Sequence, residues 1–138
     1  MWFYYALLSA LFAAFTAIFA KIGVSNVSSN LATGIRTIII LVLVWSIVFV
    51  QGEAKDIRSL SKLNIIFLVL SGVATGLSWL FYFKALQVGK VSQVAAVDKL
   101  SVAIAILLSV LFFKETLTLK TAIGALLIIS GTILFAIK

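Results

Sequence analysis

Three ionisable residues, Arg36, Asp98 and Lys99, stand inside long apolar stretches of the chain. A charge within a membrane-spanning segment costs at least ~2.5 kcal/mol to insert, so ionisable residues there usually mark function. A guanidinium or ammonium group at such a place could hold a substrate carboxylate. The Asp98 carboxylate could hold a substrate ammonium group or a coupling proton. We therefore predict that these three residues line a pathway for a small molecule.

The alternatives for these charges depend on the lengths of the side chains. Arg36 and Lys99 have long stems, which would also let their charged ends reach the membrane interface. Asp98 has a short stem, so its carboxylate needs water or a partner. Lys99 is its neighbour in sequence but points about 100° away around a helix. Arg36 of the neighbouring span is a second possible partner.

Two aromatic residues are predicted to complete this substrate site. Trp79 and Tyr82 lie within an apolar stretch and could line a pocket. They are equally consistent with packing between helices or with the aromatic belt at a membrane interface.

Residue types exclude most catalytic chemistry. The chain has no Cys, no His and only four acidic residues. Thiolate nucleophiles, the usual zinc ligands and imidazole acid–base chemistry are therefore absent. We predict that the protein is not an enzyme and holds no metal or cofactor.

Five apolar stretches occupy almost the whole chain of 138 residues, which is 64% hydrophobic with a mean hydropathy of +1.28. About 20 apolar residues cross a hydrocarbon core about 30 Å thick. Backbone groups in lipid must satisfy one another within a segment, so the stretches should be helices. We predict an all-α integral membrane protein with one domain over residues 1–138. The expected spans are Trp2–Ile22, Leu31–Val50, Leu63–Leu86, Val91–Phe113 and Leu117–Ile137.

The net charge of +7 does not indicate a nucleic-acid surface, because Lys and Arg stand mainly at span ends, beside lipid headgroups and water. Five cations lie on the face that bears the N-terminus: Lys55, Arg58, Lys62, Lys114 and Lys120. Four lie on the opposite face: Lys21, Lys84, Lys90 and Lys138. Counting Arg36 and Lys99 there raises that number to six. Orientation normally follows an excess of cations on one side. The near balance favours insertion in both orientations and pairing of inverted copies, although a weak dominant orientation is about as consistent with it.

Three sequence segments carry a family resemblance. Leu111–Thr118 reads LFFKETLT and is followed by Ile123–Gly131, which reads IGALLIISG. Upstream, Tyr82–Gly89 reads YFKALQVG. In this order and spacing they resemble the drug/metabolite transporter superfamily, and the whole chain is similar to a single EamA-type domain.

The resemblance implies a five-helix half of a ten-helix, inverted-repeat transporter. Larger members carry two such units in opposite orientation, so a single unit would complete the assembly as an antiparallel homodimer. The small multidrug resistance branch has a glycine pair seven residues apart in its last helix, and Gly124 and Gly131 match it. The resemblance therefore implies a dimer contact at these two glycines. That branch also carries a proton- and substrate-binding glutamate in its first helix, where this chain has no acidic residue.

We accordingly expect a transporter of a metabolite or amino-acid-like molecule in a prokaryotic inner membrane, working by alternating access as an antiparallel homodimer. Its partners would be lipid, a small-molecule substrate and a second copy of the chain, and not nucleic acid. A dual-topology ion channel and a non-transporting accessory subunit are the alternatives.

The charge balance predicts where the C-terminus lies. A reporter that is active on only one side of the membrane, fused to the C-terminus, should give a signal on both sides. Detection on a single face would contradict insertion in both orientations.

Overall fold

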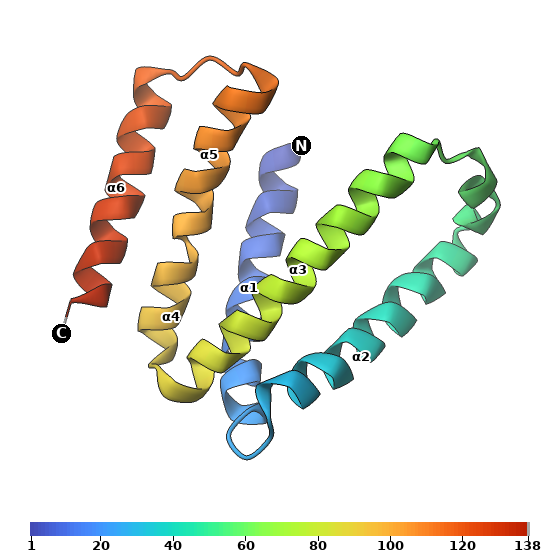
Figure 1. Ribbon diagram of the computed structural model, residues 1–138, viewed down its shortest axis with the longest axis horizontal. Helices are drawn as coiled ribbons and strands as arrows, with labels where there is room; N and C mark the ends of the chain where they lie inside the picture. The colour runs from blue at the N-terminus through green and yellow to red at the C-terminus, as the bar shows by residue number, and fades with distance from the viewer. Residues whose placement is uncertain (138) are drawn as a thin grey trace. The chain divides into compact units, whose positions relative to one another are not determined.

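The computed structural model describes residues 1–137, which contain seven helices and no strand. Lys138, which was counted among the cations, lies outside the described residues. In chain order the helices are α1 (Trp2–Gly23), α2 (Ser29–Val50), the short 3-10 helix η1 (Glu53–Ser59), α3 (Lys62–Val88), α4 (Val91–Asp98), α5 (Leu100–Phe113) and α6 (Leu119–Ala136) (Figure 1). The predicted all-α fold is confirmed.

Five membrane spans are also confirmed, since five segments of the described chain are long and apolar enough to cross a bilayer. Four of them are the single helices α1, α2, α3 and α6. The fourth span, Val91–Phe113, was expected as one helix, but it is divided into α4 and α5. The division falls at Lys99, beside Asp98.

Local capping explains where α2 and α6 begin. The Ser28 hydroxyl accepts a hydrogen bond from the Leu31 amide at the start of α2, and Thr118 does the same for Thr121 at the start of α6. Such side chains satisfy amides that have no partner within the helix. The last span was expected from Leu117, but α6 begins at Leu119 because Thr118 is its cap. Lys114 ends α5 in the left-handed conformation, with φ of 53°.

The chain divides into two compact units, each of which is described by itself. One comprises Met1–Phe19 with the chain from Val88 onward, and the other comprises Ala20–Gln87. In the first unit, α6 packs against both α4 and α5, beside which it runs in Figure 1. In the second, α2 and α3 form a helical hairpin joined through η1. Gly52 allows the sharp turn out of α2, with φ of 71°, where a side chain would be strained.

Two side chains tie the loop between α1 and α2 to the end of α3, within the second unit. The Gln87 amide donates to the carbonyl oxygens of Val24 and Val27, at 3.3 and 2.6 Å. The Lys21 ammonium donates to the carbonyl oxygen of Leu86. These bonds supply partners for carbonyls that the helices and the loop leave open. The loop therefore has a fixed place on its own unit.

The apolar faces of the helices are mostly uncovered. Among the described residues, the only buried apolar side chains are Ala17 in the first unit and Val24, Phe83 and Leu86 in the second. In a soluble protein so much exposed Leu, Ile, Val and Phe would indicate aggregation, whereas lipid tails are as apolar as these side chains. The distribution fits helices that face lipid or other membrane helices.

Candidate functional site

The fourth span is interrupted where its two charged residues lie. The Lys99 amide bonds back to the Ala96 carbonyl, and the Val102 amide bonds to the Lys99 carbonyl, at 3.1 and 3.0 Å. Both bonds connect residues three apart, which is the tighter 3-10 pattern and not the α-helical one. The interruption occurs without proline, which this chain lacks.

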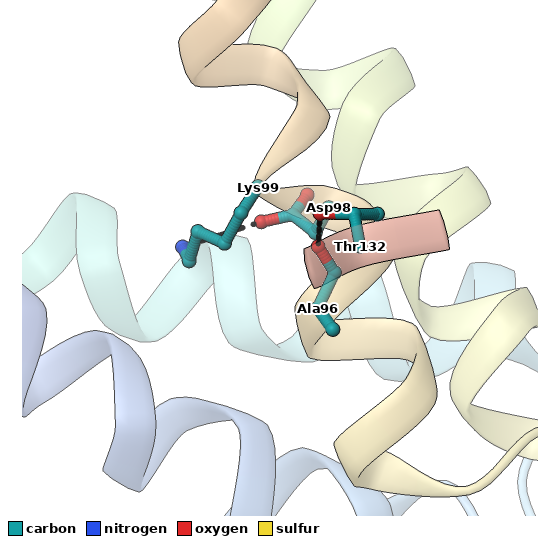
Figure 2. Close-up of polar contacts among 4 residues, drawn as sticks. All are labelled: Ala96, Asp98, Lys99 and Thr132. Atoms are coloured by element: carbon teal, nitrogen blue, oxygen red, sulfur yellow. Dashed lines mark hydrogen bonds and ion pairs between the residues drawn. The ribbon is translucent and has the colours of Figure 1, made fainter. Parts of the chain in front are cut away.

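A side chain from α6 enters the interruption. The Thr132 hydroxyl, whose residue is 5% exposed, donates to the Ala96 carbonyl across the helix pair at 3.1 Å (Figure 2). A group that inserts into the backbone ladder of a helix is an established cause of kinks. Thr132 thus provides an added partner for a carbonyl at the C-terminal end of α4.

Asp98 and Lys99 pair with each other at this point. The Lys99 ammonium lies 3.5 Å from the Asp98 carboxylate, and the two side chains are 56% and 38% exposed (Figure 2). The sequence left open whether these neighbours could meet, and the interrupted helix lets them do so. The contact is long and partly exposed, so it leaves both groups accessible to another molecule.

Arg36 lies against aromatic rings in the second unit. Its guanidinium carbon is 4.4 Å from the centre of the Trp79 ring and 5.1 Å from that of Phe83. Trp79 and Phe83 are four residues apart on α3, so they share one helix face. The Tyr82 ring lies 6.2 Å from that of Phe83, beside these two rings. We call Arg36, Trp79, Tyr82 and Phe83 the arginine–aromatic cluster.

The energetics of this cluster explain how a cation is tolerated there. Arg36 is seven residues into α2, which places it about 10 Å from the start of the helix. Cation–π contacts contribute about 0.5–2 kcal/mol each, so two of them offset much of the insertion cost of at least ~2.5 kcal/mol. They do so without neutralising the charge. Within its own unit, Arg36 forms no ion pair with either acidic residue, Glu53 or Asp56.

The structure therefore places the five predicted substrate-site residues in two groups. Arg36, Trp79 and Tyr82 lie together in one unit, and Asp98 and Lys99 lie together in the other. The suggested pairing of Arg36 with Asp98 stays a prediction, as does a substrate role for all five residues.

Two residues of these groups were not predicted as site residues. Phe83 is 2% exposed, and its position four residues after Trp79 could have identified it as the second ring on that face. Thr132 had no comparable signal, because threonine in a membrane helix commonly bonds to its own helix. Thr33, Thr37 and Thr75 do so here.

A cavity of about 470 Å³ lies beside the loop that Lys21 and Gln87 hold, lined by these two residues with Leu86 and the loop residues 24–28. Its polar side chains are largely engaged with carbonyls of the loop and of α3. No group of three His, Cys, Asp or Glu side chains suited to a metal ion occurs in the described chain.

The surface at the two glycines of α6 is unfilled. A Cβ atom built on Gly124 or Gly131 would meet no atom within 4 Å outside its own helix turn. The glycines therefore serve no close helix approach within the described chain. A role as a dimer contact remains a prediction.

Comparison with known proteins agrees with the architecture. Five apolar spans, one of them interrupted, indicate an integral, multi-pass membrane protein. The EamA-like transporter family matches residues 1–137, and the chain belongs to this family.

Two relatives extend the comparison. The chain is 44% identical over 136 residues to a Sinorhizobium protein named as an uncharacterized transporter in the cobO 3' region, covering 99% of this chain and 96% of that protein. It is also 38% identical over 84 residues to an uncharacterized protein of Methanocaldococcus jannaschii, covering 61% of each. No solved structure matches the chain significantly.

The Thr132 bond predicts a stability difference. Thr132→Val keeps the shape of the side chain but removes the hydrogen bond to Ala96, so we expect a loss of about 0.5–1.5 kcal/mol. Unfolding in mixed micelles by titration with a denaturing detergent measures this loss.

Two variants serve as controls. Thr132→Ser should retain most of the stability, because the hydroxyl is kept. Thr37→Val, which removes a hydroxyl bonded only to its own helix at 2.8 Å, should change little. Equal losses for Thr132→Val and Thr37→Val would contradict a specific role for the bond to Ala96.

Proposed function

We propose that the protein moves a small metabolite or amino-acid-like molecule across a prokaryotic inner membrane by alternating access. Two copies in opposite orientation would form the ten-helix transporter. The observation that carries the proposal is the interruption of the fourth span at Asp98 and Lys99. Transporters commonly bind substrates and ions at discontinuous membrane helices, near the centre of the bilayer.

The chemistry at the interruption supports a substrate pathway. The break shortens α4 to eight residues and leaves a partly exposed acid and base side by side. An acid that is not deeply buried can exchange a proton or accept an ammonium group. Family membership and the printed name of the Sinorhizobium relative both support transport as the activity.

The open apolar faces support assembly with a second copy. A substrate needs a pathway shielded from lipid, and the described helices leave most of their apolar side chains uncovered. The even distribution of cations permits both orientations, and inverted repeats supply the two equivalent states of alternating access. The unfilled face at Gly124 and Gly131 is the proposed contact between the copies.

Cross-linking tests the relative orientation. The absence of Cys makes introduced cysteines unique. If α6 pairs antiparallel about the middle of the Gly124–Gly131 segment, position 121 of one copy meets position 134 of the other. Thr121→Cys and Leu134→Cys, on separately tagged copies expressed together, should then form a mixed disulfide.

The same two cysteine variants can also reveal a parallel dimer. Two copies lying in the same sense would join position 121 to position 121. That product in place of the mixed one would contradict the antiparallel homodimer. Leu126→Cys, at a site 62% exposed on the side of α6 away from the two glycines, reports cross-linking from random collision.

Asp98→Asn tests the interrupted span. It keeps the size of the side chain but removes its charge, so substrate uptake into proteoliposomes should fall to background. Glu115→Gln, which removes an acid from the turn between α5 and α6, should retain uptake. Wild-type uptake with Asp98→Asn would remove Asp98 from the mechanism, and flux without counter-transport would indicate a channel.

A further inference from the structure

The arginine–aromatic cluster has a chemical preference that the proposed function leaves unspecified. We infer that Arg36, with Trp79 and Phe83 behind it, binds the carboxylate of a small organic anion. This inference rests on the proposed function, since the bound anion would be the transported substrate. It names the substrate class as anions with an apolar body.

The first step in the argument is the missing counter-charge. The second unit contains two acidic residues, Glu53 and Asp56, and both lie in η1. Arg36 stands 14 residues before the end of α2, about 21 Å along the helix from that end. The cluster therefore keeps a positive charge that its own unit does not neutralise.

The second step concerns the other acids of the chain. Asp98 already has Lys99 as a partner at 3.5 Å, and Glu115 lies in the turn between α5 and α6. The Asp98 carboxylate therefore has a cation beside it in its own unit. Arg36 is thus an intramembrane cation whose neighbours are rings.

The third step is the geometry of the rings. The guanidinium carbon lies 4.4 Å from the centre of the Trp79 ring and 5.1 Å from that of Phe83. Neither ring accepts a hydrogen bond as a carbonyl oxygen would, so these contacts leave the guanidinium N–H groups available. A guanidinium offers paired N–H groups that match the two oxygens of a carboxylate. The rings fix the position of the cation, and Trp79, which is less buried than Phe83, adds an apolar wall for the rest of the ligand.

Fluorescence of Trp79 reports binding directly. The chain has three tryptophans, so Trp2→Phe with Trp45→Phe leaves Trp79 as the only one. In nanodiscs of zwitterionic lipid, this protein is titrated with benzoate, benzamide and benzylamine, which share ring and size but differ in charge. We expect a saturable change with benzoate and none with the neutral or cationic compound.

Variants at Arg36 test the source of the selectivity. Arg36→Gln should weaken benzoate binding by about tenfold or more, because charge-assisted hydrogen bonds are lost. Arg36→Lys keeps the charge without the paired donors and should fall between. Lys84→Gln, which removes an exposed cation from α3, the helix that carries Trp79 and Phe83, should bind as the parent does. Unchanged binding with Arg36→Gln would overturn the inference.

Two further arms separate this site from the membrane itself. A protein with Trp45 as its only tryptophan should not respond, and an equal response there would reveal simple partitioning into lipid and overturn the inference. Phosphatidylglycerol in the nanodisc offers an anionic headgroup. An Arg36-dependent response to that lipid without one to benzoate would assign the site to lipid and overturn the substrate class.

The binding result and the proposed function can fail separately. Cross-linked antiparallel dimers that show no Arg36-dependent binding would leave the transporter proposal intact. Arg36-dependent benzoate binding in a protein that forms no dimer would support the site and remove the assembly.

Discussion

The absence of water in the bilayer core is the constraint on which the rest of the structure depends. Each backbone amide and carbonyl there must find a protein partner, and each charge must be compensated in some other way. Continuous helices meet the first requirement for α1, α2, α3 and α6. The chain departs from simple apolar helices at the interrupted span and at the arginine–aromatic cluster. There the backbone groups and the charges are stabilised by local contacts.

The interrupted span and the arginine–aromatic cluster use different means. At Lys99 the backbone changes its hydrogen-bond pattern, and the Thr132 hydroxyl reaches the Ala96 carbonyl from α6. At Arg36 the helix stays regular, and the side chain is stabilised by the faces of Trp79 and Phe83. The first arrangement pairs a cation with an acid, whereas the second leaves a cation without one. One fold therefore carries two polar sites of different character.

Much of this could be predicted from the sequence, because hydrophobic length is a local property. The five spans and the all-helical fold followed from runs of about 20 apolar residues. Trp79 contacts Arg36, and a substrate role for the two residues stays a prediction. The break at Lys99 could not be predicted, since no proline marks it and its partner Thr132 is 36 residues away. Phe83 was overlooked although its spacing of four residues from Trp79 places both rings on one helix face.

The loop between α1 and α2 has a consequence for biosynthesis. Its carbonyls at Val24 and Val27 are bonded by Gln87, which follows them by 63 and 60 residues in the chain. At a translation rate of 5–20 residues per second, about 3–12 s separate the emergence of the loop from that of its partner. Helices α1 and α2 are therefore synthesised before the loop between them has its partner. The end of α3 supplies that partner when Gln87 emerges.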